Sequence, residues 1–279
     1  MTVKELINSC GITPNKALGQ NFLVNTCAIE SIVAAAEING KNVLEIGPGL
    51  GSVTFELNKY AKSVLAVELD KAMVDALTSM HSEFSNPDCL EIINADFLKV
   101  SDSLLEEKLG EDFVVVANLP YYVTTPICMK LLQSGLQIQA MVLMMQKEAS
   151  ERFFAKCGTK LYAPAAILTD YLYNVSKILD LSPDSYYPQP EINSIVLKFV
   201  SKNSPLELIA PLSKILKAAF ANRRKTIQNN IMSLGVNKQE AQALLIDAGL
   251  ACNMRAEQIT TAEYIRLTEL IISRNMLKA

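Results

Sequence analysis

Residues 118–121, Asn-Leu-Pro-Tyr, carry side-chain and main-chain groups suited to holding a flat ligand. They follow the apolar run 113–117, which is typical of a buried parallel strand. Open α/β sheets bind ligands at the carboxyl edge of such strands. A side-chain amide, a main-chain carbonyl before a rigid proline and an aromatic ring together suit a flat group with an amino substituent, such as adenine. By itself the segment is more often a strand that ends in a proline turn, so its interpretation depends on the preceding sequence.

A strand, a glycine-rich turn and a helix come earlier in the chain. Residues 42–46 have a strand pattern, residues 47–51 are Gly-Pro-Gly-Leu-Gly, and residues 52–59 have a helical pattern. A second strand over 63–67 ends at Glu68. In such a Rossmann-like unit the glycines let the backbone approach a ligand, and the acid accepts hydrogen bonds from ribose hydroxyls. The pattern predicts a ribose-bearing cofactor. GxGxG departs from the dinucleotide pattern GxGxxG, and S-adenosylmethionine fits at least as well as a dinucleotide.

The alternation of helices and strands continues to about residue 200. We expect a helix over 28–37 that Thr26 caps, and a helix that begins at 125–126. Further helices are expected over 71–84, 101–109 and 147–154, and strands over 90–93, 139–145, 172–181 and 194–200. Residues 16–23 show no clear period and are expected to form a loop or arm. Asp96 follows a strand, and two roles are open for its carboxylate: it accepts a hydrogen bond from the adenine amine of a cofactor, or it caps a helix. Tyr186 begins a proline-rich segment suited to a rigid, aromatic-bearing loop.

Strand patterns disappear after residue 203. Helices are expected over 206–220, 222–233, 237–248 and 260–275, so we predict a Rossmann-like domain over 1–202 and a helical domain over 203–279. The 279-residue chain has a net charge of −3, but its charges are unevenly distributed. Residues 201–279 contain 11 Lys and Arg against 6 Asp and Glu, whereas residues 1–200 contain 15 against 23. This asymmetry indicates a polyanion-binding carboxyl-terminal region, in which the basic run 223–225 starts the second helix.

The composition is that of an ordinary globular protein, with 50% apolar and 20% charged residues. No apolar span reaches membrane length and the amino terminus lacks the apolar stretch of a signal peptide, so we expect a cytoplasmic protein. The six cysteines include no CxxC pair, and His81 is the one histidine. Neither a disulfide framework nor a zinc site is predicted.

Together these motifs resemble the ribosomal RNA adenine dimethyltransferase family. The resemblance covers nearly the whole chain and rests on residues 18–23, 45–49, Glu68, Asp96, 118–121, 146–148, Tyr186, Pro188, Pro190 and 220–226. Leu119, Thr125-Pro126 and the segment 222–226 favour the housekeeping small-subunit branch over the sister group that methylates large-subunit RNA. The sequence departs from the family pattern at 191–194, where Glu-Ile-Asn-Ser replaces the common Lys-Val-Asp-Ser, and in its overall acidity. These departures concern RNA contact and not the chemistry.

The resemblance implies an S-adenosylmethionine-dependent methyltransferase with a Rossmann-like sheet and a small all-helical carboxyl-terminal domain. It implies cofactor contacts from Asn21, Leu23, Gly47, Gly49, Glu68, Asp96 and Asn118. It further implies that Asn118 and Leu119 accept the hydrogens of an adenine amine, that Tyr121 stacks on the base, and that Tyr186, in place of a family phenylalanine, covers its other face. The implied RNA contacts are Arg223, Arg224 and Lys225.

The partner implied by the resemblance is small-subunit rRNA within an immature ribosomal subunit. Two adjacent adenosines in the loop near its 3′ end would be dimethylated, with a role in subunit biogenesis. We expect no metal and no membrane association, and we expect the protein to act as a monomer.

Two other classes remain open on the sequence. An NAD-dependent dehydrogenase would need a proton-relay residue, and no lysine, histidine or tyrosine stands in a recognisable dehydrogenase pattern. A non-catalytic ribosome-assembly factor would keep the fold without turnover, and the intact segment 118–121 disfavours it.

Overall fold

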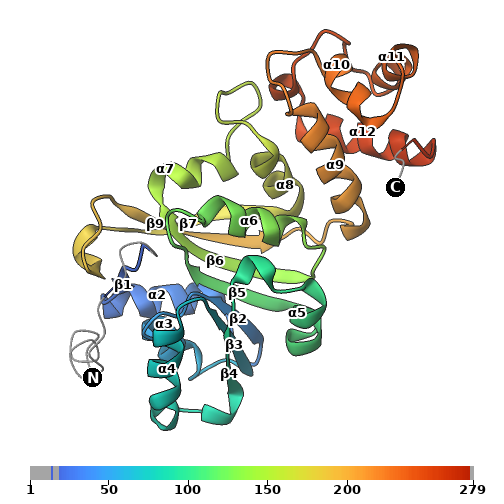
Figure 1. The fold of residues 1–279 in the computed structure, drawn as a ribbon. Helices are drawn as coiled ribbons and strands as arrows, with labels where there is room; N and C mark the ends of the chain where they lie inside the picture. The colour runs from blue at the N-terminus through green and yellow to red at the C-terminus, as the bar shows by residue number, and fades with distance from the viewer. Residues whose placement is uncertain (1–13, 15–18, 277–279) are drawn as a thin grey trace. The chain divides into compact units, whose positions relative to one another are not determined.

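The computed structural model describes residue 14 and residues 19–276, which form two compact units (Figure 1). The first contains the chain up to residue 128 together with 136–150 and 175–201, and the second contains 129–135, 151–174 and 202 onward. The sequence did not predict that two earlier segments join the carboxyl-terminal helices. Residues 16–18 of the expected arm, and Cys10, lie outside the described residues.

A mixed sheet of seven strands in the order β4-β3-β2-β5-β6-β9-β7 forms the centre of the first unit. Its strands are β2 (Asn42–Ile46), β3 (Ser63–Glu68), β4 (Leu90–Asn94), β5 (Phe113–Asn118), β6 (Ile138–Gln146), β7 (Tyr173–Leu181) and β9 (Ser194–Ser201). The first five in the sheet order are parallel, and β9 runs antiparallel to β6. Phe113 to Ala117 of β5 are all buried, which explains the unbroken apolar run in the sequence.

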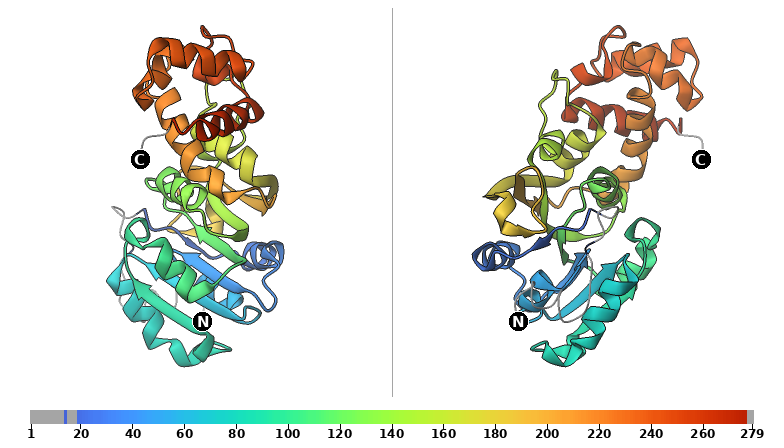
Figure 2. Two further views of the ribbon diagram at one scale, coloured as in Figure 1. Left: turned by 90° about the vertical axis from the view of Figure 1, so that its right-hand side faces the viewer. Right: turned by 60° about the vertical axis from the view of Figure 1, so that its left-hand side comes forward.

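Helices cover both faces of this sheet. They are α2 (Thr26–Ala36), α3 (Ser52–Leu57), α4 (Lys71–Ser79), α5 (Asp102–Leu109), α6 (Thr124–Gln133), which begins in this unit, and the short α7 (Lys147–Ser150). Right-handed crossovers put α3 and α4 on one face and α5 on the other, and Figure 2 shows these helices flanking the blue and green strands. The strand order reverses between β2 and β5, so their carboxyl ends lie side by side at a topological switch point.

Several predicted boundaries are wrong. Asn25, and not Thr26, caps α2, because its Oδ1 accepts a hydrogen bond from the Ala28 amide at 3.1 Å. The helix predicted over 71–84 ends at Ser79, and the one predicted over 147–154 divides into α7 and a 3-10 turn, Glu151–Phe153. The sequence also missed a two-stranded ladder between β1 (Phe22–Leu23) and β8 (Tyr186–Tyr187). Two-residue strands are too short to produce a periodic pattern.

The second unit is helical. It contains α8 (Pro164–Leu172), which the sequence did not predict, α9 (Ile209–Ala219), α10 (Ile227–Ile231), α11 (Lys238–Asp247) and α12 (Thr261–Ser273). Tyr264 lies at its centre, fully buried, and donates a hydrogen bond to the Ala256 carbonyl at 2.9 Å. Capping boxes start α11 and α12. Within the described residues, no helix is both long and apolar enough to cross a bilayer.

The helix predicted over 222–233 begins only at Ile227, so the basic run does not start a helix. Residues 222–225 form a turn, and Thr226 caps α10. The buried Asn230 side chain fixes this turn, because its amide donates to the carbonyls of Ala219 at 2.6 Å and Asn222 at 3.0 Å. A buried asparagine that satisfies two main-chain carbonyls favours the turn over a continued helix.

Candidate active site

A cavity of 220 Å³ opens at the carboxyl ends of β2, β3 and β5 in the first unit. Its lining includes nine of the residues that the sequence singled out: Asn21, Gly47, Gly49, Glu68, Asp96, Asn118, Leu119, Tyr121 and Tyr186. These residues come from segments up to 165 positions apart in the chain, from Asn21 to Tyr186. The structure therefore brings the separate motifs to one site at the switch point of the sheet.

The glycine turn forms one wall because it leaves room for a ligand beside the backbone. Gly47 and Gly49 have φ values of 71° and 56°, in the left-handed region that favours glycine. A Cβ on Gly49 would lie 3.0 Å from the Phe22 ring, which itself lines the cavity. The Gly47 amide donates to the Val67 carbonyl at 2.9 Å, which fixes the turn to β3.

Glu68 ends β3 and is 7% exposed. Its Oε2 accepts a hydrogen bond from the Gly49 amide at 3.0 Å, and its Oε1 accepts one from the Asp70 amide at 2.8 Å. Burial raises the pKa of Glu68, and the backbone amides of Asp70 and Gly49 oppose that rise. A carboxylate has about four acceptor positions, so two amides leave capacity for hydroxyl donors. Glu68 thus has a structural role in the turn and can also accept from a ribose.

The amide of Asn118 is oriented by the amino-terminal arm. Its Nδ2 donates to the main-chain carbonyl of Asn21 at 3.1 Å. Only the nitrogen of an amide can donate, so this contact leaves Oδ1 as an acceptor. The arm is held in turn by Gln20, whose Nε2 donates to Asp70 Oδ2 at 2.7 Å, and by the β1–β8 ladder.

Leu119 and two tyrosines complete the site. The Leu119 amide donates to the Met144 carbonyl at 3.0 Å, which attaches the segment to β6. Tyr121 is half-buried and its hydroxyl shares a hydrogen bond with Ser194 Oγ at 3.2 Å. Tyr186 on β8 is 3% exposed. Burial raises the pKa of both phenols, so both are protonated at neutral pH.

Of the two roles considered for Asp96, the structure shows the capping role, and it also places the residue at the cavity. It lines the cavity, and its Oδ1 also accepts from the Leu98 amide at 3.0 Å to cap the 3-10 turn Phe97–Lys99. With Glu68 it makes the cavity acidic, because among the described residues that line it there is no Lys, Arg or His. Such a lining favours a neutral or cationic ligand over a pyrophosphate.

Leu23 is the predicted cofactor contact that does not line the cavity. It is 2% exposed and packs in the core, and it pairs with Tyr186 across the short ladder. The sequence reasoning in turn missed Gln20, Phe22, Tyr122 and Phe97, which line the cavity, and Ser194, which contacts Tyr121. Gln20 and Phe22 adjoin Asn21 in one segment, and this proximity was the available signal.

Glu45 lies in β2 just before the glycine turn and is 3% exposed. Burial, together with the nearby Glu68, raises its pKa to about 8, although Thr54 opposes the rise. The side chain is therefore largely protonated at neutral pH. In the described part of the chain, no three His, Cys, Asp or Glu side chains gather in an arrangement that could hold a metal ion.

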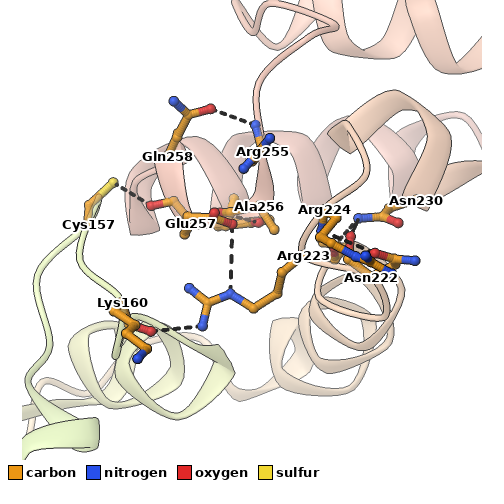
Figure 3. Close-up of polar contacts among 12 residues, drawn as sticks. Cys157, Lys160, Asn222, Arg223, Arg224, Asn230, Arg255, Ala256, Glu257 and Gln258 are labelled. Atoms are coloured by element: carbon orange, nitrogen blue, oxygen red, sulfur yellow. Dashed lines mark hydrogen bonds and ion pairs between the residues drawn. The ribbon is translucent and has the colours of Figure 1, made fainter.

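The basic run lies in the second unit, and its members have different environments (Figure 3). The Arg223 side chain reaches across to another segment, where its Nη1 donates to the Lys160 carbonyl at 2.8 Å and its Nε lies 3.9 Å from Glu257 Oε2. The Glu257 carbonyl accepts from the Gly158 amide at 2.8 Å. Arg224 and Lys225 are exposed. Arg223 therefore connects three segments of the unit, whereas its two neighbours are open to solvent.

The fold and the cavity define a Rossmann-like protein with a cavity at the switch point of its sheet, where proteins of this fold bind their ligands. The model of the family "Ribosomal RNA adenine dimethylase" matches residues 11–273, and the chain belongs to this family. Proteins named ribosomal RNA small subunit methyltransferase A are similar to it. The one from Staphylococcus epidermidis is 37% identical over 276 residues, covering 95% of this chain and 93% of that protein, and one from Staphylococcus aureus is 36% identical over 277 residues, covering 95% and 92%.

Two solved structures share the fold. A dimethyladenosine transferase from Plasmodium falciparum has a TM-score of 0.74 at 24% identity and covers 91% of this chain and 98% of its own. The 23S rRNA methyltransferase ErmE has a TM-score of 0.64 at 22% identity, and the match covers 90% of this chain and 100% of the ErmE chain. The sequence-based prediction of the family and the fold class is confirmed.

The contacts of Arg223 predict a selective effect on stability. Arg223→Ala should lower the free energy of unfolding by about 1 kcal/mol, because it removes a hydrogen bond from a charged donor and a partly exposed ion pair. Arg224→Ala removes the same charge from an exposed side chain and should change the free energy of unfolding little. Urea unfolding of both variants measures the difference, and equal effects would contradict the structural role of Arg223.

Proposed function

We propose that this protein dimethylates the exocyclic amines of two adjacent adenosines in the loop near the 3′ end of small-subunit rRNA, using S-adenosylmethionine, during assembly of the small ribosomal subunit. The observation that carries the proposal is the orientation of Asn118. Its Nδ2 is held by the Asn21 carbonyl, so that Oδ1 serves as an acceptor at a cavity lined by aromatic rings. Family membership and the names of the relatives support the same activity.

The acceptor amine is the chemical difficulty. When bound, S-adenosylmethionine supplies a methyl group already activated by its sulfonium. The adenine amine is a poor nucleophile because its lone pair is delocalised into the ring. Asn118 Oδ1 and the Leu119 carbonyl accept hydrogen bonds from its two hydrogens, which lets the nitrogen become pyramidal and directs its lone pair at the methyl carbon. The N–C bond would form as the S–C bond breaks, and the amine would release one proton in each transfer. Positioning therefore accounts for most of the rate enhancement.

Two rings hold the base. Tyr121 stacks on one face and Tyr186 covers the other, and stacking on an aromatic side chain contributes roughly 1–3 kcal/mol per base. The base has to leave its own stack to enter, which costs least in a single-stranded loop. For the second transfer the methylated amine binds with one hydrogen bond fewer, so the site accommodates a methyl group beside Asn118 or Leu119.

The charge of the cavity supports S-adenosylmethionine over a dinucleotide. Glu68 accepts from the ribose hydroxyls, and Asp96 accepts from the adenine amine of the cofactor. A sulfonium is cationic and suits two carboxylates, whereas a pyrophosphate would meet no cationic side chain among the described lining residues. This observation disfavours the NAD-dependent alternative.

The role of Glu68 predicts an effect on cofactor binding. Glu68→Ala should weaken binding of S-adenosylmethionine by about 1.5–3 kcal/mol, because hydrogen bonds to a charged acceptor are lost. Glu91→Ala is the matched control, since Glu91 is an exposed acid on the neighbouring β4 that does not line the cavity. Calorimetry on both variants measures the affinities. Unchanged affinity in Glu68→Ala would remove Glu68 from the ribose site.

The activity itself is tested on Asn118 and Tyr121. Immature small subunits from cells that lack this protein are incubated with the purified protein and cofactor, and primer extension then stops at dimethyladenosine because the pairing edge is blocked. Under single-turnover conditions Asn118→Ala should abolish most of the methylation and leave RNA affinity nearly intact, because phosphate contacts elsewhere hold the RNA. Tyr121→Phe should be mild and Tyr121→Ala severe, because the ring provides the stacking.

The control for these variants is Tyr60→Ala, which removes a half-exposed ring that does not line the cavity and should methylate normally. If the wild-type protein produced no stop, the proposed function would be wrong. Wild-type activity in Asn118→Ala would contradict the role of the amide. If Tyr121→Phe were as inactive as Tyr121→Ala, the hydroxyl and not the ring would be the essential group.

RNA binding is assigned to the exposed part of the basic turn. Arg224→Ala with Lys225→Ala should weaken RNA binding and reduce the slope of log affinity against log salt concentration by roughly 1.4–1.8, since two fewer phosphates are neutralised. The matched control, Lys217→Ala with Lys238→Ala, removes the same charge from exposed positions on α9 and α11. Equal salt slopes in the two double variants would show that only net charge matters and that the turn is not a contact site.

A further inference from the structure

Ser194 is a buried residue that the mechanism above does not use. It is the first residue of β9 and is 1% exposed, and it pairs with Gln146 of β6 in the sheet register. It does not line the cavity. Its Oγ nevertheless lies 3.2 Å from the hydroxyl of Tyr121, which does. Any influence of Ser194 on a ligand therefore passes through the tyrosine.

The hydroxyl of Tyr186 lies in the same region. It is buried and makes no hydrogen bond of its own to the protein. Ser194 and Tyr121 are the two groups close enough to affect its pKa, which burial raises. The Tyr186 hydroxyl is thus near the pair formed by Ser194 and Tyr121. Among the described residues, however, the Ser194 hydroxyl is hydrogen-bonded to the Tyr121 phenol and not to that of Tyr186.

The contact with Ser194 restricts the Tyr121 ring. The main chain of Tyr121 follows Pro120 and the anchored Leu119, so the Cβ end of its side chain is fixed. A hydrogen bond at the opposite end of the ring restricts rotation about the first side-chain torsion, because that rotation would move the hydroxyl away from Ser194. A stacking platform held at both ends is preorganised, because its orientation is set before a base arrives.

We propose that Ser194 is a positioning residue for methyl transfer, which fixes the position of the Tyr121 ring and thereby the position of the stacked adenine. The inference rests on the proposed function, since it assigns Ser194 a role in that reaction. Ser194 acts only through the phenol, so its contribution depends on the presence of the Tyr121 hydroxyl.

The test is a double-variant cycle under single-turnover conditions. Ser194→Ala should lower the methylation rate about 3- to 10-fold, the equivalent of one net hydrogen bond. In the Tyr121→Phe background the same change should have no further effect on the rate, because the partner hydroxyl is already absent. Affinity for S-adenosylmethionine should be unchanged throughout. An equal loss in both backgrounds, or no loss in either, would overturn the proposal.

Ser150→Ala is the matched control. Ser150 is also 1% exposed in the first unit, but its hydroxyl donates to the Lys147 carbonyl at 2.6 Å, and it should methylate at the wild-type rate. If Ser194→Ala does not fold, Ser194→Cys keeps the side-chain size with a weak donor and carries the same expectation. Loss of activity in Ser150→Ala equal to that of Ser194→Ala would mean that any buried serine has this effect.

A second readout separates this proposal from the proposed function. With ring-¹³C-labelled tyrosine, the signal that Tyr121→Phe identifies as Tyr121 should shift and broaden in Ser194→Ala in the RNA-free protein, because the ring is released. If the wild-type protein fails to methylate RNA, the proposed function is wrong, yet the spectrum still tests the contact. An unchanged Tyr121 signal would show that Ser194 does not hold the ring.

Discussion

The hydrogen bond from Asn118 Nδ2 to the Asn21 carbonyl is the contact on which the site depends. It links the end of β5 to an arm that lies 97 positions earlier in the sequence. It also determines which atom of the amide is left for a ligand, because the nitrogen is already used as a donor. Without it, Asn118 would be a polar residue at a strand end with no preferred orientation, and the amide would have to be ordered at the moment a ligand binds.

The arm reaches that position through contacts with three separate parts of the first unit. The Gly49 turn fits against Phe22, Gln20 bonds to Asp70 beyond the end of β3, and Leu23 pairs with Tyr186 in the β1–β8 ladder. The Val24 amide donates to the Ser185 carbonyl at 2.8 Å and extends this ladder. Leu23 therefore contributes as a buried anchor of the arm, although it does not line the cavity. Its place in a recognisable motif reflects the packing that holds Asn21.

Sequence patterns predicted the parallel core and most of the cavity because both depend on local signals. The run 113–117 is apolar since both faces of β5 are buried, and the glycine turn with Glu68 has a spacing that the Rossmann-like unit requires. The β1–β8 ladder and the Ser194–Tyr121 contact could not be predicted in this way. Each joins residues more than 70 positions apart, and nothing in the local composition of either partner specifies the other.

The basic turn shows a different limit. Arg223, Arg224 and Lys225 are similar residues in the sequence, and only tertiary contacts distinguish them. Asn230 holds the turn from inside, Arg223 bonds to Lys160, and the next two residues remain exposed. The sequence predicts that the run starts a helix, but Thr226 is the cap, because its side chain accepts a hydrogen bond from the Asn229 amide and α10 begins after it.

The uneven charge of the chain is consistent with a division of tasks between its two units. A cavity that binds a cationic methyl donor gains from carboxylates such as Glu68 and Asp96 and would lose affinity if it contained lysines. Phosphates require the opposite sign, and the exposed cations of the basic turn lie in the other unit. A net charge of −3 is therefore compatible with an RNA-modifying enzyme, because net charge averages over two sites with opposite electrostatic requirements.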